Sequence, residues 1–397
     1  MQGKKLEGKR IVLAVTGGIA AYKSCELVRL LARDGADVRV AMTEAAARFV
    51  SPLTFTALSG HPAAVSEWGS EADPMPHITL AKACDLLLVA PATADILAKA
   101  ANGIGDDLVS SLILARRTPF AVVPAMNTWM WRNPATQRNV RTLRSDGAEV
   151  WGPAAGGLAC GDSGEGRMIE PEEIAVQVRS LLHAKPLLGK RVLVTAGPTY
   201  EPLDPVRGIT NRSSGRQGYA IAGEAALQGA EVTLVSGPTA LPVPFGVERV
   251  DVITAEDMRR EVMRRARACD AFISVAAVCD WKPSAPAVQK MKKTEGSPRI
   301  EFVQNPDILA EVAGLPAPDR PYTVGFAAET ERIEEYGREK LLRKGADLVA
   351  ANDARAAIGS GSTSLSLISR EGVVRTGPVT KEEASEAILR KVAEALS

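Results

Sequence analysis

One cysteine of this chain lies in a glycine-rich stretch, GGLACGDSGEGRMIEP, at residues 156–171. Glycines in such number lose much backbone entropy on folding and contribute no apolar core. A thiol held in a flexible segment can be brought to a ligand. The stretch is therefore predicted to be either a plain surface loop or a mobile flap that carries Cys160 to a bound molecule.

Two further polar residues stand where they could act on a ligand. His77 follows a proline in DPMPHITL, and an imidazole can exchange a proton near neutral pH; the alternative is a structural histidine. Asn127, in VPAMNTWMWRNP, follows an apolar run and is surrounded by methionine and tryptophan. One amide in such apolar surroundings would orient a substrate carboxylate, although the segment could also simply close a core.

The elements that must position these residues occur twice in the chain. LEGKRIVLAVTGG from Leu6 matches LLGKRVLVTAGPT from Leu187, and ARDGADVRVAMTEAA matches ALQGAEVTLVSGPTA. AKACDLLLVAPATAD likewise matches ARACDAFISVAAVCD, in the same order. Three matching pairs in register predict two related α/β units, joined near HAKPLLGK. We expect domains at residues 1–184 and 185–397.

Each unit begins with a continuous apolar run, at residues 11–15 and 192–195, followed by glycine and an amphipathic helix. A run of this kind is typical of a strand buried on both faces of a parallel sheet. The βαβ pattern predicts two Rossmann-like, doubly wound parallel sheets, which bind ligands beyond the carboxyl ends of their strands. A helix is expected at about residues 171–182, where proline and two glutamates suit the first turn.

Three loops at predicted strand ends would admit a ligand: TGGIAAYKS from Thr16, MTEAAARFV from Met42 and APATAD from Ala90. Backbone amides at such a helix start can bind phosphate. TGGIAAYKS matches neither GxGxxG nor a Walker loop, so a two-domain NAD(P)-dependent dehydrogenase, the alternative enzyme class, is disfavoured.

Composition excludes several classes of protein. The 397 residues carry a net charge of +1 with 46% hydrophobic residues, which argues against binding to nucleic acid or anionic membrane. Five cysteines, with no CxxC pair, suit a reducing compartment. No apolar run is long enough for a membrane span. A soluble, cytoplasmic protein acting on small molecules is expected.

Taken together, the chain resembles the bacterial bifunctional phosphopantothenoylcysteine decarboxylase/phosphopantothenate–cysteine ligases of coenzyme A biosynthesis. The resemblance spans almost the whole chain. It is carried, in order, by PAMNTWMW, ACGDSGEGRM, ITNRSSGRQGYAIA, AAVCDWKP, KMKK, NPDIL and GFAAET.

The first half resembles the flavin-dependent cysteine decarboxylases, which implies bound FMN and catalytic roles for His77, Asn127 and Cys160. The implied FMN contacts are Gly17, Gly18, Ile19, Ala20, Thr43, Pro91, Ala92, Thr93 and Ala94. The implied clamp over the substrate, which would close Cys160 over it and exclude water, adds Gly161, Asp162, Arg167 and Met168. Asp95 stands where many flavin-binding relatives have asparagine, and an ionised carboxylate close to the flavin would be unfavourable.

The second half resembles the CTP-dependent ligases, which join 4′-phosphopantothenate to cysteine through an acyl-cytidylate. The resemblance assigns Asn211 to that intermediate and Lys290 of KMKK to the triphosphate, although KMKK could also be a solvated loop. The implied CTP contacts are Ser274, Val275, Ala276, Asp280, Lys290, Pro306, Asp307, Ile308, Leu309, Phe326, Lys340 and Lys344. Mg²⁺ is expected with the triphosphate, without assigned ligands.

The family also implies assembly into a homo-oligomer. Flavin domains would form trimers with sites between subunits, and ligase domains would pair, giving an assembly as large as a dodecamer. The alternative function is a CTP-dependent ligase whose first domain is inactive or regulatory.

Overall fold

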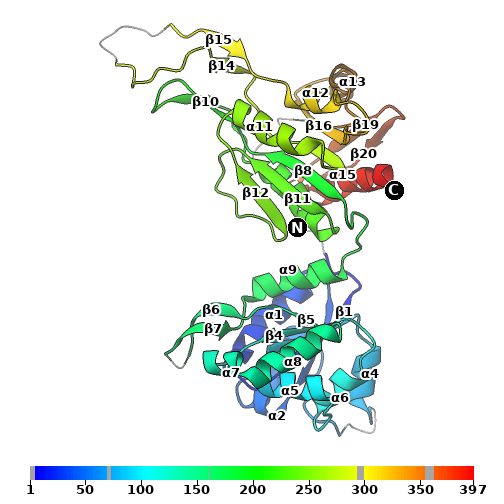
Figure 1. The fold of residues 1–397 in the computed structure, drawn as a ribbon. Helices are drawn as coiled ribbons and strands as arrows, with labels where there is room; N and C mark the ends of the chain where they lie inside the picture. The colour runs from blue at the N-terminus through cyan, green and yellow to red at the C-terminus, as the bar shows by residue number, and fades with distance from the viewer. Residues whose placement is uncertain (1–4, 69–72, 160, 293–298, 354–361) are drawn as a thin grey trace. The chain divides into compact units, whose positions relative to one another are not determined.

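The computed structural model describes residues 5–68, 73–159, 161–292, 299–353 and 362–397. These residues form two compact units, one ending at Leu182 and one comprising His183–Ser397 (Figure 1). Among them, no helix combines the length and the apolar character needed to cross a membrane.

The first unit is built on a five-stranded parallel sheet of order β2-β1-β3-β4-β5. The strands are β1 (Arg10–Val15), β2 (Asp37–Met42), β3 (Leu86–Ala92), β4 (Phe120–Pro124) and β5 (Glu149–Val150). The helices are α1 (Ala21–Arg33), α2 (Glu44–Ala47), α3 (Pro52–Ser59), α4 (Pro76–Lys82), α5 (Ala94–Asn102), α6 (Leu108–Ala115), α7 (Thr128–Arg132), α8 (Pro134–Ser145) and α9 (Pro171–Leu182). An antiparallel hairpin of β6 (Ala154–Gly157) and β7 (Ser163–Arg167) precedes α9.

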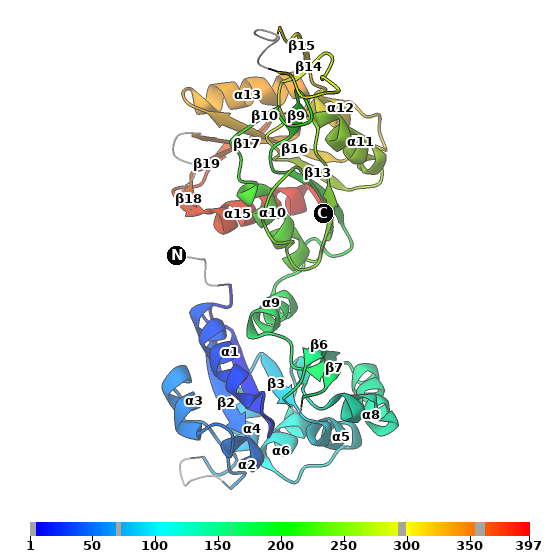
Figure 2. The ribbon, with the colours of Figure 1, turned by 90° about the vertical axis from the view of Figure 1, so that its left-hand side faces the viewer.

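Helices cover both faces of this sheet, as the continuous apolar strands predict (Figure 2). Ile11, Leu13 and Val15 of β1 pack in one apolar cluster with residues of α1 and α9. Val12 and Ala14, on the other face, pack with residues of α4, α5, α6 and α8. The carboxyl edge of the sheet remains for the loops that follow β1, β3 and β4.

The second unit has an eight-stranded sheet of order β12-β11-β8-β13-β16-β17-β19-β20. The strands are β8 (Arg191–Ala196), β11 (Glu231–Ser236), β12 (Val247–Asp251), β13 (Ala271–Ser274), β16 (Tyr322–Glu329), β17 (Leu348–Asp353), β19 (Leu365–Ser369) and β20 (Val373–Arg375). The helices are α10 (Arg216–Leu227), α11 (Ala255–Ala266), α12 (Ile308–Ala313), α13 (Ile333–Lys344) and α15 (Lys381–Leu396).

The prediction of a doubly wound α/β fold is confirmed, but this second sheet is not parallel throughout. The six strands from β12 to β17 are parallel, whereas β19 and β20 run antiparallel to their neighbours. For β20 the reason is the short turn that joins it to β19, in which the Ser369 N–H donates to the Gly372 carbonyl at 2.9 Å. A turn this short can join only antiparallel strands.

Three small antiparallel pairs complete the second unit. They are β9 (Tyr200–Pro202) with β10 (Gly208–Thr210), β14 (Trp281–Pro283) with β15 (Phe302–Gln304), and β18 (Ser362–Thr363) with β21 (Val379–Thr380). The β14–β15 pair and the described residues between its strands, 284–292 and 299–301, extend away from the large sheet of this unit as an arm (Figure 1). Lys290, Met291 and Lys292 of KMKK lie on this arm, and Lys293 is outside the described residues.

Candidate active sites

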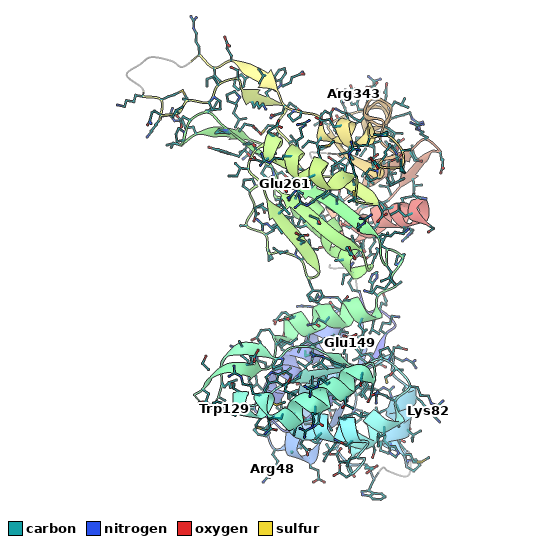
Figure 3. All side chains as sticks on the ribbon, in the orientation of Figure 1. Arg48, Lys82, Trp129, Glu149, Glu261 and Arg343 are labelled. Carbon is teal, nitrogen blue, oxygen red and sulfur yellow. The ribbon has the colours of Figure 1, made fainter. Side chains whose placement is uncertain are left out.

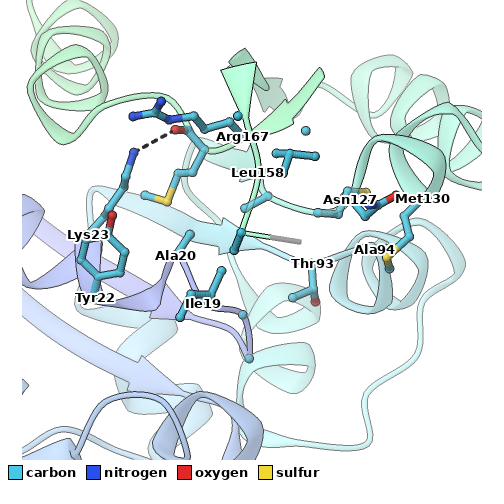
Figure 4. A pocket seen from close by; sticks show the side chains of 18 residues that line it. Ile19, Ala20, Tyr22, Lys23, Thr93, Ala94, Asn127, Met130, Leu158 and Arg167 are labelled. Carbon is cyan, nitrogen blue, oxygen red and sulfur yellow. Dashed lines mark hydrogen bonds between the residues drawn. The ribbon is translucent and has the colours of Figure 1, made fainter. Parts of the chain in front are cut away.

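The first unit contains a cavity of about 540 Å³ at the carboxyl ends of β1, β3 and β4. Figure 4 shows the Ile19–Ala20 turn on one side, the β6–β7 hairpin opposite, and Asn127 with Met130 at a third side. The predicted site residues that line it are Gly17, Gly18, Ile19, Ala20, Thr93, Ala94, Asn127, Arg167 and Met168. The cavity is large enough for a cofactor-sized ligand.

A buried hydroxyl joins the two loops that form the floor of this cavity. Thr16, 2% exposed, donates its Oγ1 hydrogen to the Pro91 carbonyl at 2.7 Å. The same oxygen accepts the Thr93 N–H at 3.2 Å, and Thr93 caps helix α5. The turn after β1 and the turn after β3 are therefore held together, and this fixes the relative positions of Gly18 and Ala94.

Three of the predicted flavin contacts lie next to the cavity rather than on its wall. Pro91 and Ala92 are buried within the end of β3. Thr43 caps the short helix α2 by accepting the Ala46 N–H at 3.1 Å. A Cβ on Gly17 would lie 2.4 Å from that of Ala45, so α2 packs directly against the Gly17 turn.

Asn127 is positioned by the short helix that it begins. Its Oδ1 accepts the Trp129 N–H at 2.8 Å, and its Nδ2 donates to Oδ2 of Asp162 at 2.9 Å. Asp162 lies at the tip of the β6–β7 hairpin, two positions after Cys160 in the sequence; Cys160 itself is outside the described residues. Trp129 is 73% exposed beside this site (Figure 3). The amide predicted to orient a substrate thus contacts the predicted clamp.

The glycine-rich stretch forms an antiparallel hairpin, and two of its glycines have a packing reason. A Cβ on Gly166 would lie 2.2 Å from the Met126 carbonyl oxygen, and one on Gly164 would lie 2.7 Å from the Thr128 hydroxyl. Both have positive φ, at 141° and 156°. The Met126 N–H also bonds the Gly166 carbonyl at 2.9 Å. These two glycines let the hairpin lie directly on the backbone that carries Asn127.

Replacing Gly166 with alanine is expected to move β7 away from Met126 and to open the cavity. The added methyl group overlaps a backbone oxygen and also strains a positive φ, so we expect at least about 2 kcal/mol loss of unfolding free energy. Gly157→Ala, where no atom lies within 4 Å, is the matched control. Urea unfolding measures the difference, and equal stability of the two variants would contradict the packing argument.

A buried lysine that the sequence analysis missed ties the clamp to helix α1. Lys23 donates to the Met168 carbonyl at 3.3 Å and to both oxygens of Glu170 at 2.9 Å. Glu170 also binds Arg167 at 2.6 Å. The hydrogen bond from Lys23 holds the pKa of the Glu170 carboxyl below its usual range. The signal was present in TGGIAAYKS, where a lysine stands on the apolar side of a predicted helix.

His77 and Asp95 both lie away from the cavity wall of their own chain. His77 is half-buried on α4, and its Nδ1 is buried without a hydrogen-bond partner among the described residues. Asp95, 72% exposed, pairs with Lys99 at 3.3 Å, so its charge faces solvent. Neither residue lines the cavity that contains Asn127.

In the second unit, most predicted nucleotide contacts meet at the carboxyl ends of β13 and β16. Ser274 pairs in register with Gly325, one residue before Phe326. A Cβ on Gly325 would lie 2.7 Å from the Leu309 side chain, so α12 packs closely on β16. The Asn305 N–H donates to the Asp280 carbonyl at 2.8 Å, and the next residue in the chain is Pro306.

Two lysines of α13 face this edge, as their spacing predicts. Lys340 donates to the Phe326 carbonyl, and Lys344 pairs with Asp307. Burial lowers the pKa of Lys340, and the neighbouring Lys344 lowers it further. A half-buried ammonium beside a second cation is an arrangement that an anionic ligand would stabilise.

Asn211 joins this group, whereas Lys290 stands apart from it. Asn211 donates to the carbonyls of Ala277 and Val278 at 3.0 and 3.1 Å, just beyond β13. Lys290 is exposed on the β14–β15 arm. Among the residues that the structure describes, no group of three or more acidic, histidine or cysteine side chains could hold a metal ion.

Two protein-family models match this chain, one in each half. One, described as Flavoprotein, matches residues 1–183. The other, described as DNA/pantothenate metabolism flavoprotein C-terminal domain, matches residues 187–396.

Curated relatives match both halves together. The coenzyme A biosynthesis bifunctional protein CoaBC of Vibrio cholerae serotype O1 is 49% identical, covering 98% of this chain and 99% of the relative. The protein of the same name from Bacillus subtilis is 42% identical, covering 98% and 97%. A crystal structure of the C-terminal domain of a CoaBC protein is 39% identical, covers 54% of this chain and 98% of that domain, and has a TM-score of 0.46.

Proposed function

This chain belongs to the family of bifunctional coenzyme A biosynthesis proteins and has decarboxylase and ligase activities, and from that premise we propose how its two units divide the chemistry. The first, up to about residue 184, decarboxylates 4′-phosphopantothenoylcysteine with FMN. The second, from about residue 185, makes that substrate from 4′-phosphopantothenate, cysteine and CTP. A ligase with an inactive or regulatory first domain is not favoured, because the relatives match both halves.

The single observation that carries the decarboxylase assignment is the cavity at the strand ends of the first unit, with Asn127 on its wall. Its residues fit FMN: Gly18 and Ile19 form a turn before α1 that suits a phosphate, and Thr93 and Ala94 form the second such turn. Bound FMN supplies a reversible two-electron redox step, without which loss of CO2 from a cysteine would leave a carbanion with no sink.

The protein side chains orient the substrate and move its protons. The Asn127 amide would bind the carboxylate that leaves as CO2. His77 would take up and return a proton at the substrate sulfur, and Cys160 would supply the proton that completes the saturated product. The hairpin contact between Asn127 and Asp162 supports closure of the clamp over a substrate bound at Asn127.

His77 would complete the cavity of another subunit. It does not line the cavity of its own chain, and its buried Nδ1 has no partner among the described residues. Both facts support trimer-based assembly with sites between subunits, and pairing of ligase units would extend the homo-oligomer, up to a dodecamer.

In the ligase reaction, a carboxylate oxygen of 4′-phosphopantothenate attacks the α-phosphorus of CTP and pyrophosphate leaves. The cysteine amine then attacks the acyl carbon and CMP leaves. Lys340 and Lys344 would bind phosphates, Lys290 would stabilise charge during the first step, and Asn211 would orient the cytidylate for the second. Mg²⁺ would accompany the triphosphate, bound mainly by phosphate and water.

The first test is the visible spectrum of the purified protein, combined with both activity assays. We expect a flavin spectrum, release of FMN on heating, and CO2 formed from supplied 4′-phosphopantothenoylcysteine. Pyrophosphate should appear when CTP and 4′-phosphopantothenate are added. A protein that stays colourless in excess FMN but forms pyrophosphate would contradict the decarboxylase assignment and leave the ligase assignment standing.

A further inference from the structure

Asp204 is a buried carboxylate in the second unit that the site described above does not use. Its side chain has 0% exposed surface, and it lies in the turn between β9 and β10. Its Oδ1 accepts the N–H groups of Val206 and Arg207, each at 2.8 Å. A buried carboxylate is costly unless its oxygens are satisfied by donors, so this residue is held in place for a structural or functional reason.

The second oxygen of Asp204 reaches the arm that bears Lys290. Oδ2 accepts the Met291 N–H at 3.2 Å, from a residue 87 positions further along the chain. Nη2 of Arg207 donates to the Met291 carbonyl at 3.3 Å. Both polar groups of the Met291 backbone are therefore bound by the same turn, immediately after Lys290.

A third bond fixes the other end of this short segment. The Ala287 N–H donates to the Leu203 carbonyl at 2.9 Å. Residues 287–291 are thus bound at both ends by the turn 203–207, while the Lys290 side chain between them stays exposed. The turn 203–207 therefore holds the arm at the short segment that carries the Lys290 ammonium group.

The same turn continues into the site. Strand β10 runs from Gly208 to Thr210, and the next residue, Asn211, binds the carbonyls of Ala277 and Val278 beyond β13. Burial alone would raise the pKa of Asp204, but the backbone N–H donors from Val206, Met291 and Arg207 hold the pKa below its usual range. The carboxylate therefore stays ionised and keeps all its acceptor sites at neutral pH.

We propose that Asp204 is a positioning residue of the ligase reaction: by binding the Met291 N–H it fixes the backbone next to Lys290 and so holds that ammonium group for the triphosphate. The proposal rests on the role given to Lys290 under the proposed function. Asparagine cannot replace Asp204 here, because its NH2 group would face N–H donors on one side or the other.

The test compares Asp204→Asn with the unchanged full-length holoenzyme in one turnover of cytidylate formation. With saturating CTP and 4′-phosphopantothenate and no cysteine, we expect pyrophosphate release to slow by about tenfold, the effect of a misplaced group. Decarboxylation of supplied 4′-phosphopantothenoylcysteine by the same preparation should be unchanged. Glu301→Gln, an exposed carboxylate on the same arm, is the matched control and should leave both rates unchanged.

A double-mutant cycle with Lys290→Gln separates positioning from general destabilisation. If Asp204 acts through Lys290, Asp204→Asn should cause no further loss in the Lys290→Gln background. Losses that multiply would overturn the proposal, as would a normal rate for Asp204→Asn beside a slow Lys290→Gln. If Lys290→Gln itself is fast, the assigned role of Lys290 fails, and the positioning role fails with it.

A second variant keeps the proposal testable if Asp204→Asn does not fold. Arg207→Gln leaves the buried carboxylate with its backbone donors and removes only the bond to the Met291 carbonyl. We expect a smaller decrease in pyrophosphate release than for Asp204→Asn, with an unchanged unfolding midpoint. An unaltered rate in Arg207→Gln, together with unfolding of Asp204→Asn, would overturn the proposal in favour of a purely structural carboxylate.

Discussion

Replacing His77 with asparagine should slow decarboxylation by about 10²- to 10⁴-fold, the usual contribution of a positioned acid/base. The ligase reaction of the same chain should be unchanged, because α4 belongs to the first unit. Asparagine keeps the polarity and approximate size but cannot exchange a proton at neutral pH. CO2 release from supplied 4′-phosphopantothenoylcysteine and pyrophosphate release from CTP measure the two activities on one preparation.

His61 provides the matched control in the same unit. Its Nε2 pairs with Asp37 at 2.6 Å, at the opposite end of β2 from the cavity. His61→Asn should leave decarboxylation within about twofold, because a partly exposed pair contributes little. Equal losses in both variants would indicate destabilisation of the unit and contradict the acid/base role of His77.

Mixed oligomers test whether His77 serves a neighbouring chain. His77→Asn and Asn127→Ala should each have much slower decarboxylation alone, but chains of both kinds assembled together should recover part of the activity. Recovery requires a site with an intact His77 from one chain and an intact Asn127 from another. If both groups act within one cavity of one chain, the mixture should stay inactive.

The sequence could predict that both sets of candidate residues lie at the carboxyl ends of strands, because doubly wound parallel sheets bind ligands at that edge. Glycine and small residues after apolar runs marked the Gly17–Ala20 and Pro91–Ala94 turns, and the first of these lines the cavity in full. Spacing alone also predicted that Lys340 and Lys344 share a face of α13. Both features depend only on the order of residues within a short segment, so the sequence pattern is enough to predict them.

The residues that were missed act through contacts between distant segments. Lys23 binds Glu170, and Asp204 binds Met291; nothing in either local sequence indicates the partner. The sequence also could not show that Gly164 and Gly166 are required by packing, because a flexible backbone and the close approach of a neighbouring backbone both favour glycine. Only the position of the 126–128 backbone distinguishes the two explanations.

Replacing Lys340 with methionine should lower kcat/KM for CTP by about 10- to 100-fold, the effect of losing one charge-assisted hydrogen bond at a partly buried position. Methionine approximates the length of the side chain and suits the half-buried position. Lys391→Met is the control: that lysine, on α15, pairs with Glu394 at 2.6 Å near the surface. Rates of pyrophosphate release at varied CTP measure both variants, and equal kcat/KM would contradict a phosphate role for Lys340.

The pH dependence of CTP binding gives the same residue an independent signature. Burial and the nearby Lys344 lower the pKa of Lys340, so its neutral form gains population at a lower pH than in an unfolded chain. On the proposed function the triphosphate would bind the charged form of Lys340, and CTP affinity should therefore fall as pH rises through the lowered pKa, by up to about tenfold per pH unit. The contribution of Lys340 to the free energy of unfolding changes with pH in the opposite direction to the CTP affinity. It rises with pH between the lowered pKa and 10.5, because the unfolded chain then binds more protons. If CTP affinity falls with rising pH while the free energy of unfolding does not, and the fall is absent from Lys340→Met, the group that titrates is the Lys340 ammonium.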